Sequence, residues 1–257
     1  MPKIRFTILG SGTSTGVPTI GCECPVCLSD DPRDKRLRCS LLIESDETTV
    51  LIDTSSDFRQ QMLKSNVKKL DAVIYTHHHF DHIGGFDDIR ALNYIMDSPI
   101  NVFASESTLD NLKRTFLYAF EKPEQIGGGL PQINTFTINS NPFVIGDLEF
   151  IPIPLFHGKL EVYGFRIANF AYCTDTNRIP DSSMDLLKDL DVLILDALRF
   201  TKHSTHFTIN EAVEVIHALK PKNAYLTHIS HHVKHKETEK KLPENVFLAY
   251  DGIKFEL

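Results

Sequence analysis

The sequence lacks a hydrophobic run that could cross a membrane, and none of its 257 residues lies in an apolar stretch of that length. The first ten residues predict a β-strand, not a basic region followed by an apolar run, so we expect no secretory signal and a cytoplasmic protein. An excess of positive charge is also absent, since the formal net charge is −7. Such a balance gives no bulk attraction to anionic membranes or nucleic acid, and we expect neither as a partner.

The sequence also has no clear internal repeat, no low-complexity segment and no obvious linker. With 42% hydrophobic residues the chain can bury one large core, so we expect a single domain spanning residues 1–257. Cysteine is scarce, and three of the five cysteines crowd together at Cys22, Cys24 and Cys27. In a chain that is not secreted, this crowding indicates metal binding before disulfides.

Strands and helices are predicted in both halves of the chain. The expected strands cover residues 4–9, 41–43, 50–52, 72–75, 133–138, 148–154, 161–167, 169–173, 192–195 and 224–227, and the second and third of these form a hairpin. The expected helices cover residues 55–65, capped by Ser55 or Ser56, and residues 84–96, 105–119 and 208–219, the last behind Thr208. A loop is expected at residues 127–129. This mixture predicts the α/β or α+β class.

A polar residue follows most of the apolar strands. These residues are Asp53, His77, His157, Asp175, Asp196 and His228. Polar groups at the ends of buried strands converge on one rim of a sheet, and loops on a rigid scaffold are where chemistry is usually placed.

The segment after the strand at residues 72–75 has the spacing of a metal site. His77 and His79 lie two apart, so both imidazoles of an extended segment point the same way, and Asp81 and His82 follow at once. Imidazoles and carboxylates suit zinc, iron or manganese. Four ligands on one loop are too many for a single open tetrahedral site but suit two ions.

This histidine-rich pattern resembles the metallo-β-lactamase superfamily. The resemblance implies a four-layer αβ/βα sandwich with two divalent ions, Mn²⁺ or Zn²⁺, at the edge between two sheets. It implies that one ion is held by His77, His79 and His157, that the other is held by Asp81, His82 and His228, and that Asp175 bridges them. Asp53 would orient a metal-loop histidine by hydrogen bonding. The pairing of Asp81 with His82, without a cysteine ligand, resembles the phosphodiesterase and ribonuclease Z branch.

The three crowded cysteines predict a closed structural zinc that needs one more ligand. Spacing leaves Cys39, His231 and His232 open as the fourth ligand. The glycine- and threonine-rich residues 10–18, followed by these cysteines, resemble the PhnP family of cyclic phosphodiesterases. In that family a histidine three residues after a metal-ligand histidine completes the structural site, which implies His231. The coenzyme PQQ biosynthesis protein of the same superfamily shares these features, so they do not fix the substrate.

Two histidines precede the predicted helix at residues 208–219. A general acid must reach the leaving oxygen with a pKa near the working pH, and histidine suits that role. By resemblance His206, just before the helix cap, is the catalytic histidine that does not bind metal, and His203 is the alternative.

Together these features predict a metal-dependent phosphodiesterase acting on a small or cyclic phosphodiester. The resemblance adds phosphoribosyl 1,2-cyclic phosphate and 2′,3′-cyclic nucleotides as substrates. A hydroxide held between the two ions would attack phosphorus, with Asp81 holding one ion, and His206 would protonate the departing alkoxide. The alternatives are ribonuclease Z-like tRNA processing, which the acidic balance disfavours, and a PQQ-biosynthesis-like metal-binding protein. The sequence leaves the oligomeric state open between a monomer and a homodimer.

Overall fold

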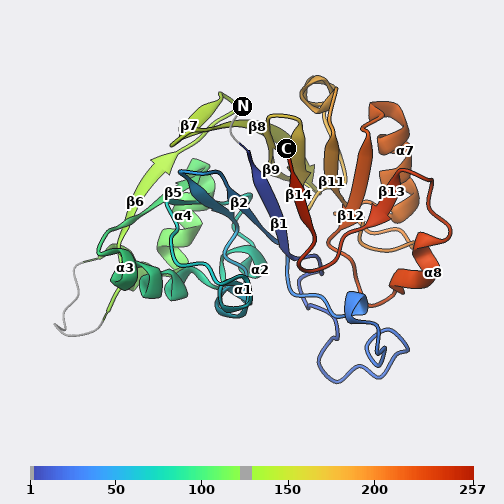
Figure 1. Ribbon diagram of the computed structural model, residues 1–257, viewed down its shortest axis with the longest axis horizontal. Coiled ribbons are helices and arrows are strands. Elements are labelled where there is room, and N and C mark those ends of the chain that lie inside the picture. The colour runs from blue at the N-terminus through green and yellow to red at the C-terminus, as the bar shows by residue number, and fades with distance from the viewer. Residues whose placement is uncertain (1–2, 122–128) are drawn as a thin grey trace.

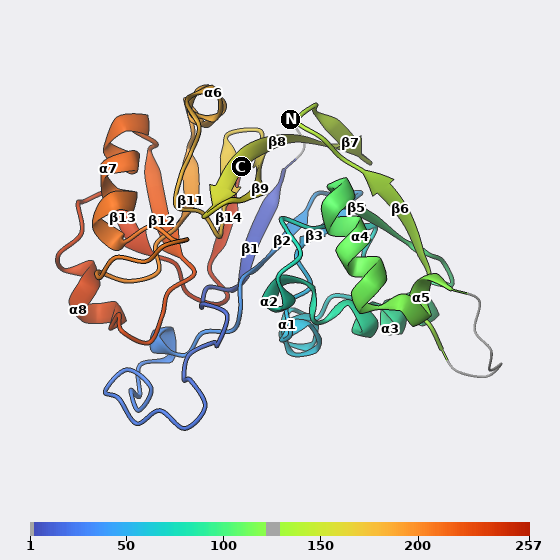
Figure 2. The same cartoon turned by 180° about the vertical axis from the view of Figure 1, so that it is seen from behind.

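The computed structural model describes residues 3–121 and 129–257, which form two facing β-sheets with helices on their outer faces (Figure 1). Figure 2 shows the same layers from behind, with α3 and α4 beside one sheet and α7 beside the other. The α/β class and the four-layer αβ/βα sandwich are therefore confirmed. Of the loop expected at residues 127–129, residues 127 and 128 lie outside the described chain.

The first sheet has the strand order β14-β1-β2-β3-β4-β5-β6. Its strands are β1 (Arg5–Gly10), β2 (Ser40–Glu44), β3 (Thr49–Ile52), β4 (Ala72–Ile74), β5 (Ile100–Ala104), β6 (Ile133–Thr137) and β14 (Lys254–Glu256). Strands from β14 to β3 pair antiparallel, and those from β3 to β6 pair parallel. The predicted hairpin is confirmed, because Leu41 of β2 lies opposite Ile52 of β3.

The second sheet has the order β13-β12-β11-β10-β9-β8-β7. Its strands are β7 (Phe143–Ile145), β8 (Leu148–His157), β9 (Leu160–Ile167), β10 (Phe170–Cys173), β11 (Val192–Asp196), β12 (Asn223–Thr227) and β13 (Val246–Leu248). Strands β10 to β13 are parallel, and β7 to β10 are antiparallel. Parallel strands bring their carboxyl ends to the same edge, so the residues that follow β10, β11 and β12 become neighbours.

The central strands of each sheet are buried on both faces, which explains why they are continuous apolar runs. On β3, Ile52 packs into the core between the sheets while Leu51 packs under the helices of the first sheet. On β11, Ile194 faces the same central core and Leu193 faces the helix layer of the second sheet. This alternation is the two-residue period of a β-strand, and it fixes which side chains are left to the sheet edge.

The helices are α1 (Phe58–Ser65), α2 (Phe80–Ile83), α3 (Arg90–Met96), α4 (Glu106–Thr115), α5 (Leu117–Phe120), α6 (Asp181–Met184), α7 (Ile209–Leu219) and α8 (His235–Glu239), with 3₁₀ helices η1 (Pro32–Asp34), η2 (Phe86–Ile89) and η3 (Asp185–Leu187). Among the described residues, no helix has both the length and the apolar character that a membrane crossing requires.

The predicted start of α7 is confirmed. The Thr208 hydroxyl accepts a hydrogen bond from the Glu211 amide, and the Glu211 carboxylate accepts one from the Thr208 amide, which makes a complete capping box. The prediction for α1 was wrong at its start. The N-cap is Asp57, because the Ser55 hydroxyl accepts from the Asp57 amide and donates to Gln61 instead of capping the helix.

The single helix expected over residues 84–96 is divided into η2 and α3, preceded by the short α2. Two glycines separate α2 from η2: a Cβ on Gly85 would lie 2.3 Å from the Ser55 carbonyl oxygen, and one on Gly84 would lie 2.6 Å from the Ser56 hydroxyl. Only residues without a side chain allow this close packing. The break lets α2 form a separate turn directly after the histidine cluster.

Candidate metal centre

The residues predicted from the strand ends meet at one edge between the two sheets. Two groups that share one residue, and a third made of Asp196, His206 and His228, each have donor atoms that all lie within 4.8 Å of one another. The first consists of His77, His79, His157 and Asp175, and the second consists of Asp81, His82, Asp175 and His228. Asp175 belongs to both groups, so its carboxylate lies where the two meet.

The chain leaves three strands in an unusual backbone conformation at this edge. Asp53 after β3, Asp175 after β10 and His228 after β12 have φ angles of 62°, 55° and 60°. The left-handed conformation costs a residue with a side chain about 1–3 kcal/mol and tends to occur at functional sites. Here the left-handed conformation directs these three polar side chains into the site. If the strands continued in an extended conformation, the side chains would not point into it.

The hydrogen bonds around His77 determine which of its nitrogens is available. The Thr76 hydroxyl donates to Asp53 Oδ2 at 2.8 Å, so at 3.0 Å it accepts from His77 Nδ1. The lone pair of His77 is therefore on Nε2, which lies 3.0 Å from His79 Nδ1 and 3.8 Å from Asp175 Oδ2. Burial lowers the pKa of His77 well below its usual value. A neutral imidazole with an inward lone pair is the form that binds metal.

His82 lies among carboxylates at the second group. Its Nδ1 donates to Asp53 Oδ2 at 2.7 Å, while Nε2 lies 3.2 Å from Asp175 Oδ1 and 3.3 Å from Asp81 Oδ2. Burial lowers the pKa of His82, but the three carboxylates outweigh burial and raise this pKa well above its usual value. Within residues 3–121 and 129–257, the buried Nε2 makes no hydrogen bond. A cation at Nε2 would take the place of a proton there.

His157 and His228 complete the two groups. His157 Nδ1 donates to the Thr205 carbonyl oxygen at 2.8 Å, which leaves Nε2 as its acceptor. His228 is buried, and neither of its ring nitrogens has a hydrogen-bond partner in the described chain. Its Nε2 lies 3.4 Å from Asp175 Oδ2 and 3.8 Å from Asp81 Oδ2. Buried polar atoms are almost always satisfied, so these nitrogens fit a ligand that the protein itself does not supply.

The donor set therefore fits divalent metal ions such as zinc. Imidazoles and carboxylates suit first-row divalent metals, and the arrangement supplies acidic oxygens to balance their charge. The ring orientations are already set by second hydrogen bonds, from His82 to the Asp53 carboxylate and from His157 to the Thr205 carbonyl oxygen. Such supporting contacts are what hold metal ligands in place.

His206 lies beside this centre and is joined to Asp196. Its Nδ1 donates to Asp196 Oδ2 at 2.7 Å, and the same oxygen accepts from the Thr176 amide at 3.1 Å. The His206 ring centroid lies 4.5 Å from those of His157 and His228. Burial opposes protonation, but Asp196 outweighs it by its charge and hydrogen bond and raises the pKa of His206 to about 9.

His203, the alternative acid, has a different environment. Its ring centroid lies 5.1 Å from that of His206, and its Nδ1 accepts from the Thr205 amide at 3.4 Å. Burial lowers the pKa of His203. Asp196 was noted at a strand end, but no role was predicted for it. The sequence signal for a role of Asp196 was its position at the end of a buried strand, like the other polar residues of the site.

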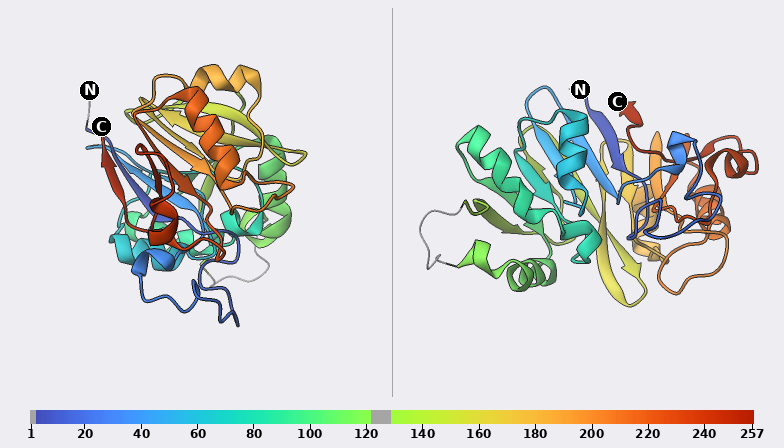
Figure 3. Two further views of the ribbon diagram at one scale, coloured as in Figure 1. Left: turned by 90° about the vertical axis from the view of Figure 1, so that its right-hand side faces the viewer. Right: turned by 90° about the horizontal axis from the view of Figure 1, so that it is seen from below.

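The cysteine loop forms a second, separate cluster. The Sγ atoms of Cys22, Cys24 and Cys27 lie 3.2, 3.5 and 3.6 Å from His231 Nδ1. The Cys27 backbone amide donates to Cys24 Sγ and lowers the pKa of Cys24 to about 6, which favours the thiolate that binds metal. Figure 3 shows this blue loop projecting from the body beyond β1.

The structure separates the three candidates for the fourth position of this cluster. Cys39 is buried elsewhere, with its Sγ 3.5 Å from the Gly12 carbonyl oxygen. His232 Nδ1 lies 3.3 Å from the Ser230 hydroxyl. His231 alone of the three is grouped with the cysteines.

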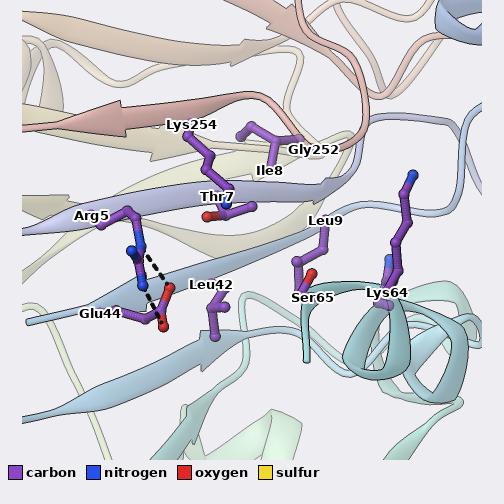
Figure 4. A pocket seen from close by; sticks show the side chains of 11 residues that line it. Arg5, Thr7, Ile8, Leu9, Leu42, Glu44, Lys64, Ser65, Gly252 and Lys254 are labelled. Carbon is purple, nitrogen blue, oxygen red and sulfur yellow. Dashed lines mark hydrogen bonds and ion pairs between the residues drawn. The ribbon is translucent and has the colours of Figure 1, made fainter. Parts of the chain in front are cut away.

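A depression on the outside of the first sheet shares no residue with either cluster (Figure 4). Its lining includes Arg5, Lys64 and Lys254, but Arg5 is paired with Glu44 at 3.0 Å. With one cation neutralised and two on exposed lysines, this depression gives no sign of a built anion site.

Comparison with known proteins agrees with the geometry. The family model described as a beta-lactamase superfamily domain matches residues 48–229, a span that contains all seven histidine and aspartate donors. A crystal structure described as a new diphosphatase from the PhnP family is 44% identical, covers 99% of this chain and 97% of that chain, and has a TM-score of 0.93. Zinc-bound PqqB from Methylobacterium extorquens is 17% identical with a TM-score of 0.79, over 98% of this chain and 100% of that one, and so shares the fold.

A curated relative from Porphyromonas gingivalis, named octanoyltransferase, is 39% identical over 254 residues. The match covers 97% of this chain but 51% of the relative. The chain thus spans about half the length of that protein.

Proposed function

Because this chain belongs to the metallo-β-lactamase superfamily and is PhnP-like, we propose that it is a phosphodiesterase that hydrolyses small or cyclic phosphodiesters. The observation that carries this proposal is the double donor group around Asp175 with the His206–Asp196 pair beside it. The first part suits binding of a phosphate group, and the second suits proton delivery to a leaving oxygen.

We propose two divalent ions, manganese or zinc, at this centre. One would be held by His77, His79 and His157, the other by Asp81, His82 and His228, with Asp175 shared. Seven donors in two overlapping groups exceed what one catalytic ion with an open position uses. When bound, such ions activate water and neutralise charge on the phosphate oxygens.

The chain's own residues prepare the site for this chemistry. Asp53 and the Thr205 carbonyl fix the rings of His82 and His157, so little rearrangement is needed on binding. The Nδ1–H of His206 donates a hydrogen bond to Asp196. The Nε2–H of the imidazolium therefore remains available to protonate the departing alkoxide. We therefore assign the general acid to His206 and not to His203.

The cysteine cluster has a different task in this proposal. Cys22, Cys24, Cys27 and His231 would hold one structural zinc, and four protein ligands leave no position for water or substrate. His231 lies three residues after His228, so this zinc would tie the cysteine loop to the rim of the active centre.

Hydrolysis of a diphosphate is the second candidate, favoured by the 44% identity to the protein described as a diphosphatase. The two reactions differ in the leaving group, because a phosphate leaves without a proton more readily than a sugar alkoxide. Octanoyl transfer, named for the relative from Porphyromonas gingivalis, we assign to the half of that protein that this chain does not match.

The test is a substrate panel with protein loaded with manganese or zinc. It contains phosphoribosyl 1,2-cyclic phosphate, 2′,3′-cyclic nucleotides, bis-p-nitrophenyl phosphate, a nucleoside diphosphate and a precursor tRNA. We expect turnover of the cyclic esters and of bis-p-nitrophenyl phosphate. Turnover of the diphosphate alone would favour the second candidate, and turnover of the tRNA alone would favour a processing nuclease. No turnover of any substrate would contradict a hydrolase.

A further inference from the structure

The loop that carries His206 has no regular secondary structure of its own. It runs between β11 and α7, and its base is fixed by a hydrogen bond from the Leu198 amide to the Phe207 carbonyl oxygen at 3.0 Å. The tip of this loop, residues 200–206, contains Ser204 and Thr205 immediately before His206. The position of the His206 ring therefore depends on its own bond to Asp196 and on what holds the backbone of Ser204 and Thr205.

Two side chains from outside the loop bind that backbone. His157 Nδ1 donates to the Thr205 carbonyl oxygen at 2.8 Å, and Asn177 Nδ2 donates to the Ser204 carbonyl oxygen at 3.0 Å. Asn177 also binds the loop of His157, because its Oδ1 accepts from the Gly158 amide at 2.8 Å. Both polar atoms of the Asn177 amide are thus used, one on each loop.

Asn177 is itself held rigidly. Its backbone amide donates to the Phe156 carbonyl oxygen at 3.0 Å, and the Phe156 amide donates to the Arg178 carbonyl oxygen at 3.0 Å. The two loops are also in direct contact, since a Cβ on Gly158 would lie 2.8 Å from Thr205 Cγ2. The spacing between the His157 loop and the His206 loop is therefore close, and Asn177 spans it.

We propose that Asn177 is a positioning residue that holds His206 at its working distance from the metal centre by joining the loops of His157 and His206. This inference rests on the proposed role of His206 as general acid. Asn177 does not touch the reacting atoms in this account. It acts through Ser204 on the acid. His157 keeps its own bond to Thr205 when Asn177 is changed, and a variant that retains the Asn177 bond to the Gly158 amide separates an effect on the acid from one on the His157 loop.

The test compares Asn177→Ala with wild type on a 2′,3′-cyclic nucleotide and on bis-p-nitrophenyl phosphate. A displacement of about 1 Å in a catalytic group costs roughly 10²-fold, so we expect kcat on the cyclic nucleotide to fall by about 10- to 100-fold. The nitrophenyl ester needs no acid, and its kcat should fall less than about threefold. Metal content should not change. In the His206→Ala background, Asn177→Ala should cause no further loss on the cyclic nucleotide.

A second variant keeps the test valid if Asn177→Ala does not fold. Asn177→Asp keeps the acceptor for the Gly158 amide and removes only the donor to Ser204. We expect the same selective loss, although the added carboxylate would favour the protonated form of His206. Asn134→Asp on the edge strand β6 makes the same chemical change away from both loops and should behave as wild type.

Equal losses on both substrates, additive losses in the double variant, or a wild-type Asn177→Asp would each overturn the positioning role. If His206→Ala itself shows no preference between the substrates, the acid role is wrong and the positioning role falls with it. Selective loss in His206→Ala without selective loss in either Asn177 variant overturns the positioning role alone.

Discussion

At the scale of single residues, the site depends on which nitrogen of each histidine is engaged by the protein. Asp53, Thr76 and Thr205 each bind one ring nitrogen of a different histidine and leave the other for the centre. His82 and His206 differ from the other two histidines, because each binds a carboxylate, Asp53 or Asp196, that favours the charged ring. Burial thus favours the neutral ring of His77 and His157, whereas the carboxylates around His82 suit a bound cation in place of its proton, and Asp196 suits the proposed acid role of His206.

Removing the acid should affect substrates unequally. His206→Ala should lower kcat on a cyclic ribose phosphate by about 10²–10⁴-fold, the usual contribution of general acid catalysis, and should lower it far less on bis-p-nitrophenyl phosphate. Metal content, measured in parallel, should be unchanged. Loss of an ion on substitution would make His206 a ligand, and an unaffected enzyme would move the acid role to His203 or water. As a contrast, Asp81→Ala should lower the rates of both substrates, because it would disturb the ion proposed at this position to activate the attacking water.

The pH dependence of the cyclic-ester reaction should report the His206–Asp196 pair. The acid must be protonated, and Asp196 raises the pKa of His206 to about 9, so kcat should hold through neutral pH and fall above about pH 9. Asp196→Asn removes the charge that raises this pKa. The falling limb should then move toward the ordinary value for histidine, roughly 6.5. If the falling limb stays at the same pH in Asp196→Asn, the limb reports the titration of another group.

At the scale of elements, the parallel strand ends explain why distant residues become neighbours. Register places Asp196 beside Thr227 at the ends of β11 and β12, and His228 follows directly. The sequence was sufficient to predict this convergence, because an apolar run ending on a polar residue is visible without any long-range information. The short strands β5, β7, β13 and β14 were missed. The equally short β4 was recognised because its apolar run leads directly into the histidine cluster, whereas no such motif follows the four missed strands.

The contacts that position the acid could not be predicted from sequence. Asn177 and Ser204 are 27 residues apart, and His157 binds a backbone carbonyl 48 residues away. Every residue has a backbone carbonyl, so the sequence does not show which carbonyl accepts a hydrogen bond. Only the folded chain shows these bonds. The separate turn α2 and the later start of the helix expected at residues 84–96 were missed for a similar reason. The close approach of Gly85 to Ser55 is a tertiary contact.

The cysteine loop is the element whose role is tested by stability. Cys24→Ser should weaken the proposed structural zinc site and lower the melting temperature more than it lowers activity per folded molecule. The reason is that a closed four-ligand site contributes folding energy and has no open position for chemistry. The measurement pairs thermal unfolding with turnover corrected for zinc bound. Unchanged melting with lost turnover would show that the loop has a catalytic role.

At the scale of the whole molecule, the sandwich makes one edge rigid enough for the centre. The core between the sheets contains residues of both, such as Ile52 and Ile194, and each outer face is covered by helices. Donors from the first sheet, such as His77, and from the second, such as His157, therefore meet across a packed interior. A disturbance of either sheet would change the spacing of the donors. Many of the donors follow central strands, which are held in place by neighbours on both sides.

The most direct test of this account is anomalous scattering from crystals of the protein fully loaded with manganese or zinc. We predict two peaks at the centre, roughly 3.5–4 Å apart as in other two-metal sites, with the Asp175 carboxylate between them. One peak at full occupancy, with Asp175 turned away from it, would contradict the two-metal centre on which the proposed phosphodiesterase depends.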